Sequence, residues 1–250
     1  MGITASGVKR FLGGDSGTRL KLLKLIIFDC DGTLVDSQHL IVSAMHAAYG
    51  AHDLPVPPRE RLLSIVGLSL AEAFRTLGEG HPAYPVASLV EGYRAAFFAL
   101  RQAQTQVEPL FPGAREAVEM LACRPDVVLG IATGKSRRGV EGVLARHDLL
   151  GHFRTIQTAD TSPSKPDPAM VIEAMRETGI APADTVVVGD TAFDMRMAQS
   201  AGAAGIGVAW GYHPPDALRA AGAVAVIEEF PALLPTLERM WAAPAAAAAE

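Results

Sequence analysis

The sequence predicts an α/β fold, a doubly wound parallel sheet with a small α-helical domain inserted into it. Three observations support this prediction. After residue 112, short Val- and Ile-rich runs alternate with helical stretches, which is typical of a parallel sheet covered on both faces. Residues 36–110, in contrast, contain helical stretches and no continuous β-rich run. With 250 residues, of which 49% are hydrophobic, the chain can bury a core of this size.

The first strand is predicted at residues 25–28, an apolar run that ends at Asp29. The insert is then expected to hold four helices whose boundaries are marked by prolines. These helices are predicted at residues 37–49, 60–66, 69–77 and 86–104. The Gly-rich residues 1–23 are expected to form a flexible extension. Their loose match to a myristoylation pattern at Gly2 carries little weight in so short a motif.

The second half of the chain is expected to supply the rest of the sheet and its covering helices. Strands are predicted at residues 127–132, 155–158, 185–188, 205–209 and 223–227. Helices are predicted at residues 114–123, 136–147, 168–178, 193–201 and 230–240. The chain is thus divided into an α/β core of residues 24–35 and 111–241, a helical cap of residues 36–110 and an Ala-rich tail of residues 242–250.

Composition excludes several functional classes. A net charge of −5 with scattered Lys and Arg offers no basic stripe for nucleic acid and no polybasic patch for a membrane surface. Cys30 and Cys123 are too few for a disulfide framework and lack the spacing of a zinc site, which favours a reducing cytoplasm. No run approaches the ~18 apolar residues of a membrane span. We expect a cytoplasmic monomer or homodimer that binds neither nucleic acid nor membranes.

Two carboxylates at the end of the first strand are the first candidate functional residues. Asp29 and Asp31 are one residue apart, so an extended backbone turns both to one side. Two like charges that are close together persist only with a cation or a shared proton, and Mg²⁺ prefers such oxygen ligands. On these residues alone, an ordinary strand end with an Asp-Gly turn explains the pair equally well.

The strand at residues 127–132 is followed by Thr133 and Gly134, just before a helix that begins near Ser136. A hydroxyl, a glycine amide and a helix N-terminus together suit the oxygens of a phosphate group. An ordinary helix cap is the alternative. A Walker A loop is disfavoured because only three residues separate Gly130 from Gly134, and they belong to an apolar strand.

Charged residues also follow the next two strands. Lys165 lies between prolines that stiffen its loop, so its ammonium group could be aimed into a site, although a lone loop lysine is usually a solvated charge. Asp190 and Asp194 follow the strand at residues 185–188 and are expected to face the same opening. Helix capping by Asp190, with Asp194 complementing the helix dipole, explains each residue singly but not their convergence with Asp29 and Asp31.

The four strand ends together resemble the four motifs of haloacid dehalogenase superfamily phosphatases, with a Rossmann-like core. The resemblance rests on Asp-Cys-Asp-Gly-Thr-Leu-Val-Asp-Ser at residues 29–37, Thr133, Lys165, and Gly-Asp-Thr-Ala-Phe-Asp at residues 189–194. The helical insert after the first motif also matches, and the phosphoglycolate phosphatase-like subgroup is the most similar. The resemblance extends from residue 24 to about residue 230.

This resemblance implies a catalytic role for each motif. Asp29 would be the nucleophile that forms an aspartyl phosphate, and Asp31 would act as general acid and then general base. Thr133, Gly134 and Lys165 would hold the phosphoryl oxygens.

The resemblance also implies an Mg²⁺ cofactor. The ligands would be Asp29, the backbone carbonyl of Asp31, and Asp190, while Asp194 would act on the metal from outside the ligand set.

The implied substrate is a small soluble phosphate monoester such as phosphoglycolate or a sugar phosphate. The cap would close over it, and His39, Arg75 and Arg94 are candidates to face it. A sugar phosphomutase of the same fold remains the nearest alternative, and a non-catalytic phosphate- or metal-binding module is another. A dehalogenase would not need Asp31. Neither cysteine is followed by the arginine of a cysteine phosphatase, and a response-regulator receiver would lack the insert.

Overall fold

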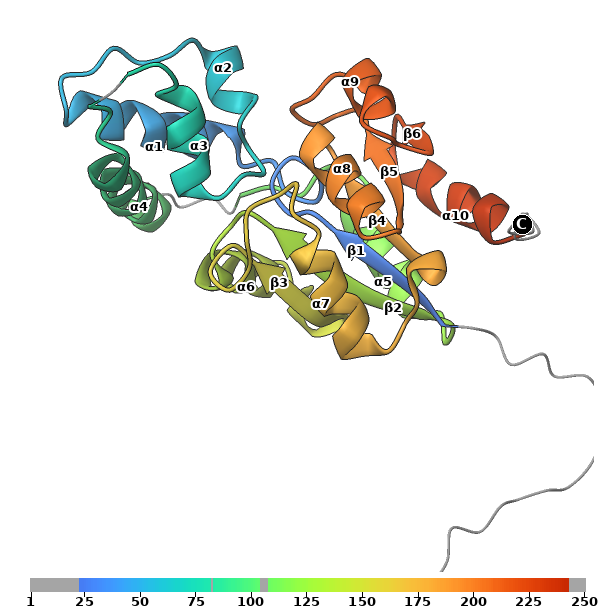
Figure 1. Cartoon of the computed structure of the whole chain (residues 1–250). Helices are drawn as coiled ribbons and strands as arrows, with labels where there is room; N and C mark the ends of the chain where they lie inside the picture. The colour runs from blue at the N-terminus through green and yellow to red at the C-terminus, as the bar shows by residue number, and fades with distance from the viewer. Residues whose placement is uncertain (1–22, 82, 104–107, 243–250) are drawn as a thin grey trace, which may run out of the picture.

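The computed structural model describes residues 23–81, 83–103 and 108–242. The predicted extension with Gly2 and the predicted Ala-rich tail lie outside these residues, except at residues 23 and 242. The described residues form a six-stranded sheet in the order β3-β2-β1-β4-β5-β6, and every pairing in it is parallel (Figure 1). The strands are β1 (Lys24–Phe28), β2 (Val127–Thr133), β3 (Phe153–Thr158), β4 (Thr185–Gly189), β5 (Ala204–Val208) and β6 (Ala225–Ile227).

Both faces of the sheet are covered because the central strands are apolar on both sides. In β1, Ile26 and Phe28 belong to one core cluster, whereas Leu25 and Ile27 belong to another. The first face is covered by α5 (Ala114–Ala122), α6 (Arg137–Arg146) and α10 (Leu233–Ala242). The second face is covered by α7 (Ala169–Thr178) and α8 (Ala192–Ser200). The predicted doubly wound α/β fold is confirmed.

The strand order places the candidate residues at one edge of the sheet. The first strand, β1, lies inside the sheet. The next two strands, β2 and β3, lie on one side of it, and β4, β5 and β6 lie on the other. This reversal makes β1 the neighbour of both β2 and β4. Ligands of open parallel sheets bind outside the carboxyl ends of the strands at such a switch point.

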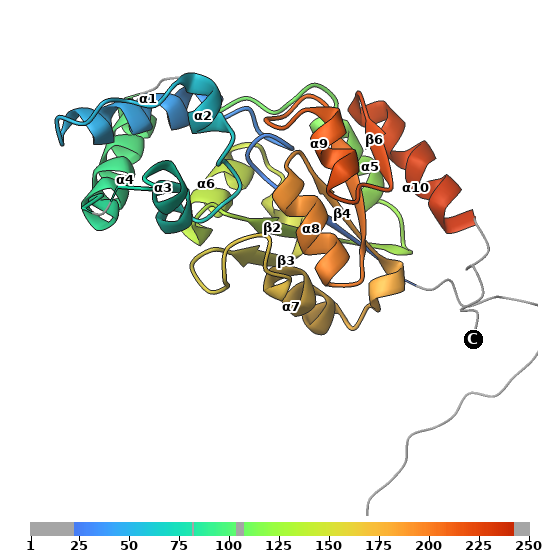
Figure 2. The same ribbon diagram turned by 45° about the horizontal axis from the view of Figure 1, so that its top comes forward.

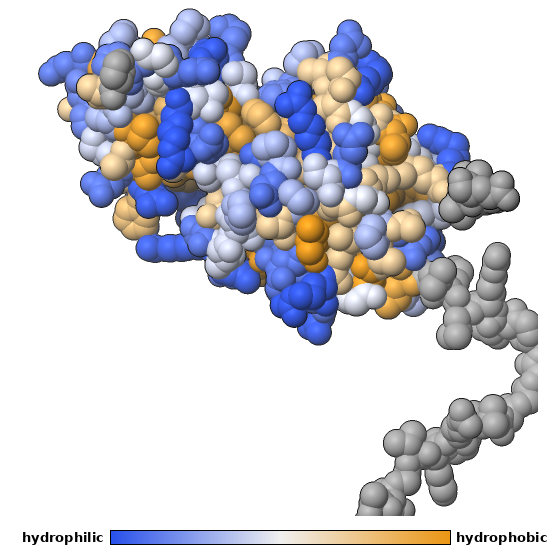
Figure 3. All heavy atoms as spheres, viewed as in Figure 1, coloured by the Kyte–Doolittle hydropathy of each residue, from blue (hydrophilic) through white to orange (hydrophobic). Residues whose placement is uncertain are grey.

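Four helices, α1 (Gln38–Gly50), α2 (Arg59–Leu63), α3 (Leu70–Leu77) and α4 (Val86–Ala103), lie together to one side of the sheet (Figures 1 and 2). We refer to these helices and their connections as the cap. Tyr49, Phe74 and Leu89 are fully or almost fully buried in an apolar cluster of the cap's own. Phe193 and Tyr212 of the core also pack against this cluster. On the face shown in Figure 3, hydrophilic side chains cover much of the cap, with apolar ones where it adjoins the core.

The structure differs from the predicted elements mainly at short segments. The helix predicted at residues 60–66 ends at Leu63, and the one predicted at residues 230–240 begins as a 3₁₀ turn at Phe230–Ala232. A helix that we did not predict, α9 (Pro215–Ala220), packs Leu218 against α8. Six residues are too few to show a helical period, so packing rather than propensity forms this helix. None of the helices in the described ranges is long and apolar enough to cross a membrane.

Candidate active site

Asp29 is the residue around which the site is built. It directly follows β1, and its backbone N–H donates to the carbonyl of Val188 in β4, 2.9 Å away, so the sheet fixes its position. Its side chain is buried, and Oδ1 accepts a hydrogen bond from the Cys30 N–H (2.7 Å) and contacts the Lys165 ammonium (2.9 Å). Oδ2 is equally buried but has no hydrogen-bond partner among the described residues.

Asp190 and Asp194 are carried by β4, which pairs with β1, and by the helix α8 that follows it. Asp190 follows β4, and its carboxylate accepts hydrogen bonds from Thr33 Oγ1 (2.8 Å) and the Tyr212 N–H (2.9 Å). Asp194 lies in the first turn of α8 and forms a capping box with Thr191, which is the N-cap of this helix. The alternative that Asp190 caps the helix is therefore wrong, because Thr191 takes the cap position, whereas Asp194 does lie in the first turn, where an acid complements the helix dipole.

Carboxylate oxygens of Asp29, Asp190 and Asp194 lie within 4.8 Å of one another, and all three side chains are buried. Like charges this close require a counter-ion, and the unpartnered Oδ2 of Asp29 is the kind of atom that a metal ion would satisfy. The absence of a side chain at Gly32 makes room for this group, because a Cβ there would collide with Asp190 Oδ2 at 2.3 Å. The residues present fit a hard divalent cation. The side chain of Asp31 is not part of this group.

Lys165 is the buried cation of the site. It lies in the loop between β3 and α7, and its side chain is fully buried. Its ammonium contacts Asp29 Oδ1 at 2.9 Å and Asp194 Oδ1 at 2.6 Å. The fold therefore places Lys165 beside carboxylates that are far from it in the sequence.

Burial and like charge shift the titration of these groups. Burial raises the pKa of Asp29 from 3.8 to about 7, with Lys165 opposing the rise and Asp194 adding to it. Burial also raises the pKa of Asp190 well above its ordinary value, and Asp29 and Asp194 add to this effect. For Lys165, burial acts to lower the pKa, but Asp194 and Asp29 outweigh it and raise the pKa. The lysine therefore stays charged, and its single positive charge is too little to neutralise the three carboxylates.

Thr133 and Gly134 form the end of β2 and the turn that follows it. Thr133 is buried, and its Oγ1 accepts a hydrogen bond from the Lys135 N–H (3.2 Å) rather than capping α6. The cap of α6 is Ser136, which accepts from the Gly139 N–H. Both Thr133 and Gly134 line a cavity that also reaches Asp29 and Asp31.

Asp31 has a partner that sequence reasoning missed. Its carboxylate is held by the ammonium of Lys135, 2.8 Å from Oδ1 and 3.1 Å from Oδ2, and by Ser37 Oγ at 2.5 Å from Oδ1. Lys135 is part of the Thr-Gly-Lys-Ser stretch that we examined as a Walker A loop and rejected. Nothing in the spacing of the chain indicates that this lysine meets a carboxylate 104 residues earlier.

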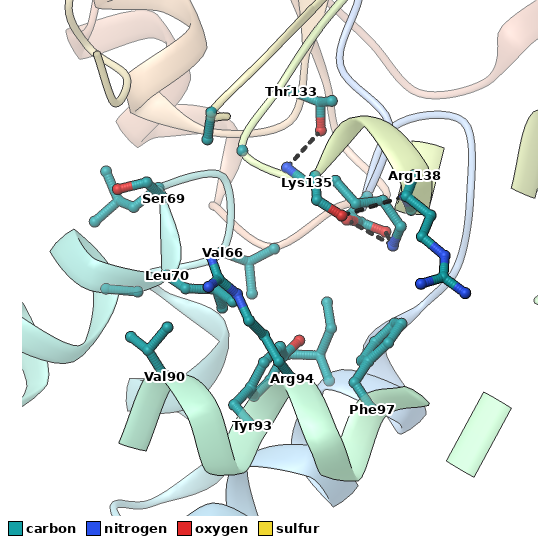
Figure 4. A pocket seen from close by; sticks show the side chains of 18 of the residues that line it. Val66, Ser69, Leu70, Val90, Tyr93, Arg94, Phe97, Thr133, Lys135 and Arg138 are labelled. Atoms are coloured by element: carbon teal, nitrogen blue, oxygen red, sulfur yellow. Dashed lines mark hydrogen bonds and ion pairs between the residues drawn. The ribbon is translucent and has the colours of Figure 1, made fainter. Parts of the chain in front are cut away.

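The cavity between the cap and the core has a volume of about 840 Å³ (Figure 4). At one end it is lined by Asp29, Asp31 and Thr133 of the core, and at the other by apolar and aromatic residues of the cap such as Val66, Leu70, Val90, Tyr93 and Phe97. Of the three cap residues proposed to face a substrate, Arg94 lines the cavity and His39 and Arg75 do not.

Comparisons with known proteins agree with this geometry. The family model for haloacid dehalogenase-like hydrolases matches residues 26–208. "Probable phosphatase IndB" of Dickeya dadantii is 36% identical over 82% of this chain and 90% of its own length. The phosphoglycolate phosphatase of Chromobacterium violaceum is 32% identical over 80% of this chain and 91% of its own. A solved hydrolase from Pseudomonas syringae is 28% identical and has a TM-score of 0.72, with 86% of this chain and 98% of that chain covered.

The family match covers the end of every strand that carries a candidate residue, from Asp29 after β1 to Asp194 in α8. The relatives align over four fifths or more of this chain. With the six-stranded parallel sheet and the helical insert after its first strand, this establishes that the chain belongs to the haloacid dehalogenase-like hydrolase family.

Proposed function

We propose that this protein is an Mg²⁺-dependent phosphatase that hydrolyses small phosphate monoesters through an aspartyl phosphate on Asp29. The observation that carries the proposal is the environment of Asp29. Asp29 lines a substrate-sized cavity, and one of its oxygens contacts Lys165, whereas the other is buried with no hydrogen-bond partner among the described residues. Carboxylate oxygens of Asp190 and Asp194 lie within 4.8 Å of those of Asp29. The names of the curated relatives, a phosphatase and a phosphoglycolate phosphatase, support the same activity.

In the first step Asp29 attacks phosphorus, the bond to the ester oxygen breaks, and Asp31 donates a proton to the departing alcohol. In the second step Asp31 accepts a proton from water as the water attacks the aspartyl phosphate. Inorganic phosphate is released and Asp29 is restored. Thr133, Gly134 and Lys165 hold the phosphoryl oxygens throughout, since positioning and charge stabilisation are most of what phosphoryl transfer requires.

The metal would be held by Asp29, Asp190 and the backbone carbonyl of Asp31. A bound Mg²⁺ would offset the negative charge shared by Asp29 and the phosphoryl group. Asp194 keeps one oxygen on Lys165 (2.6 Å) and the other on Thr191 Oγ1 (2.7 Å), so it fixes these neighbours from outside the ligand set. The cap would then close over the bound ester and exclude water, with residues near 36 and 109–112 as hinges.

The substrate class follows from the cavity and the relatives. A cavity of about 840 Å³ between the cap and the core suits a small soluble ester, such as a phosphoglycolate-like compound or a sugar phosphate, and is too small to hold a folded protein. A sugar phosphomutase would use the same core but return the phosphoryl group to its substrate. We therefore retain the mutase as the second candidate, and a non-catalytic binding module as the third.

The test is phosphate release from a panel of small esters, including phosphoglycolate and hexose phosphates, with and without Mg²⁺. We expect Mg²⁺-dependent turnover that Asp29→Asn lowers by at least about 10³-fold, because the amide cannot act as the nucleophile. Asp216→Asn is the matched control, since the side chain of Asp216 is 97% exposed on α9 and, within the part of the chain that the structure describes, pairs only with Arg219.

Retention of wild-type turnover by Asp29→Asn would contradict the mechanism. Conversion of glucose 1-phosphate to its isomer without phosphate release would identify a mutase, and inactivity in both assays would bring back the non-catalytic binding module.

A further inference from the structure

Lys135 is a buried lysine that the mechanism above does not use. Only 8% of its side chain is exposed, and its ammonium contacts Asp31 at 2.8 Å and Glu108 at 3.6 Å. Burial acts to lower the pKa of Lys135, but Asp31 and Glu108 outweigh it and raise the pKa above its ordinary value. A charge is kept in such a place only when it is paired. Lys135 therefore has a defined task in the folded protein.

The contacts of Lys135 continue into the cap. Glu108 is buried, and its Oε2 lies 3.1 Å from Nε of Arg101 near the end of α4. Neither carboxylate oxygen of Glu108 accepts a hydrogen bond from a described residue, so the two cations are what neutralise it. The result is a row of alternating charges, Arg101, Glu108, Lys135 and Asp31, that links α4 to the strand ends.

Both connections between the cap and the core reach this row. Glu108 belongs to the returning connection, and Ser37, at the start of the outgoing one, donates to Asp31 Oδ1 at 2.5 Å. From the cap, the ring of Phe97 in α4 covers the ammonium of Lys135, 5.0 Å from the ring centre (Figure 4). A shift of α4 relative to the core therefore acts on Lys135 directly.

The contacts at Asp31 are unequal between its two oxygens. Ser37 and Lys135 both contact Oδ1, at 2.5 and 2.8 Å, whereas Lys135, at 3.1 Å, is the one hydrogen-bond partner of Oδ2 among the described residues. Oδ2 is the less tightly held oxygen and so the one free to carry a transferred proton. With Oδ1 fixed, the direction in which Oδ2 points is fixed as well.

We propose that Lys135 is a positioning residue that aims the carboxyl group of Asp31 at the leaving-group oxygen and links this aim, through Glu108 and Arg101, to the placement of α4. The inference rests on the proposed phosphatase function. The proton moves from Asp31 Oδ2 to the ester oxygen as the phosphorus–oxygen bond breaks, and Lys135 keeps its own protons.

A role through Asp31 has a consequence that a purely structural role lacks. An alkyl phosphate must have its leaving oxygen protonated, so it depends on a well-aimed acid. The leaving group of 4-nitrophenyl phosphate is 4-nitrophenolate, which departs as a stable anion, so hydrolysis of this ester depends little on the acid. Loss of Lys135 should therefore lower kcat/KM for the first ester far more than for the second.

The experiment uses the full chain and the variants Lys135→Met, Lys135→Arg and Lys24→Met. Lys24→Met is the matched control because Lys24 pairs with Asp184 at the opposite end of β1. We expect Lys135→Met to lower kcat/KM by about 10²-fold for an alkyl phosphate and by less than about 5-fold for 4-nitrophenyl phosphate. Lys135→Arg, which restores the cation, should recover part of the loss.

A double-mutant cycle completes the test. In an Asp31→Asn background, Lys135→Met should cost nothing further, because the two residues act as a unit. If Lys135→Met does not fold, judged by its thermal unfolding, Arg101→Gln serves at the far end of the row and should show the same leaving-group dependence in weaker form.

Equal losses for both esters, or losses that add to those of Asp31→Asn, would overturn the inference. Its failure is distinguishable from failure of the proposed function. In the latter case the wild-type protein itself would release phosphate from neither ester, which would remove the basis of both.

Discussion

Gly134 of the core lies directly against a loop of the cap. A Cβ at this position would be 2.5 Å from the backbone carbonyl oxygens of both Gly67 and Leu68, which form the cap loop between α2 and α3. The same loop is held by a hydrogen bond from the Ser69 N–H to Ser164 Oγ (2.8 Å). The absence of a side chain at Gly134 therefore sets how close the cap loop can come to the phosphate-binding turn.

Gly134→Ala is expected to displace this loop, since two backbone carbonyls cannot be relieved by a side-chain rotation. We expect kcat/KM to fall by about 10- to 100-fold, because small misplacements at a reacting centre are costly. The measurement is the kinetics of phosphate release together with thermal unfolding. Gly151→Ala is the control, since nothing lies within 4 Å of a Cβ there. Unchanged kinetics in Gly134→Ala would mean that the loop does not control the site.

At the scale of elements, α4 of the cap and α6 of the core face each other across the cavity. Arg94 extends from α4 and Arg138 from α6 toward the space between them (Figure 4). Among the described residues, neither guanidinium has an acidic partner within 4.0 Å, in contrast to Arg101 on the same helix. Arg138 instead lies over the ring of Phe98, 5.3 Å from its centre. These two unpaired cations favour a substrate with a second negative group.

Arg94→Gln and Arg138→Gln test this expectation. We expect KM to rise about 10-fold for esters with a second anion, such as phosphoglycolate, and little for esters whose phosphate is their only anion, such as ethyl phosphate, because the lost contact is an ion pair. Arg75→Gln is the matched control, since Arg75 pairs with Glu72 outside the cavity. The expectation fails if both classes of ester change equally.

At the scale of the whole molecule, a chain of net charge −5 buries three carboxylates side by side at its sheet edge. The folded-state pKa of Asp29 is raised from 3.8 to about 7, and that of Asp190 is also raised. A raised pKa means that the folded protein holds these protons more tightly than the unfolded chain. The resulting stabilisation is present at low pH and is lost as the pH rises toward about 7.

A divalent cation replaces these protons, so its effect on stability should grow with pH. We expect saturating Mg²⁺ to raise the unfolding temperature by several degrees at about pH 8 and by much less at about pH 5.5. Asp190→Asn should lose most of the shift at the higher pH, and Asp216→Asn should retain it. The measurement is thermal unfolding followed by circular dichroism. An equal shift at both pH values would mean that Mg²⁺ does not compete with protons on these carboxyl groups.

Much of the site could be predicted because its parts are local. An apolar run that ends in Asp29, and a second that ends in Asp190, mark strand ends, and parallel strands bring their carboxyl ends to one edge. The resemblance implied that Lys165 holds the phosphoryl oxygens, but its contact with Asp194 was not predicted, because a loop lysine has no periodicity that gives its direction. The domain boundaries near residues 35 and 110 and the catalytic roles of the residues remain predictions.

The sequence by itself determined the α/β class, the inserted helices and the strand ends that carry charge, because hydrophobic period and turn residues are properties of a short stretch. The tertiary structure alone decided which charges meet. Lys135 reaches Asp31 across 104 residues, and Thr33 reaches Asp190 across 157. Such contacts depend on strand order and on the seating of the cap, which are set by packing of the whole chain and leave no signature in local spacing.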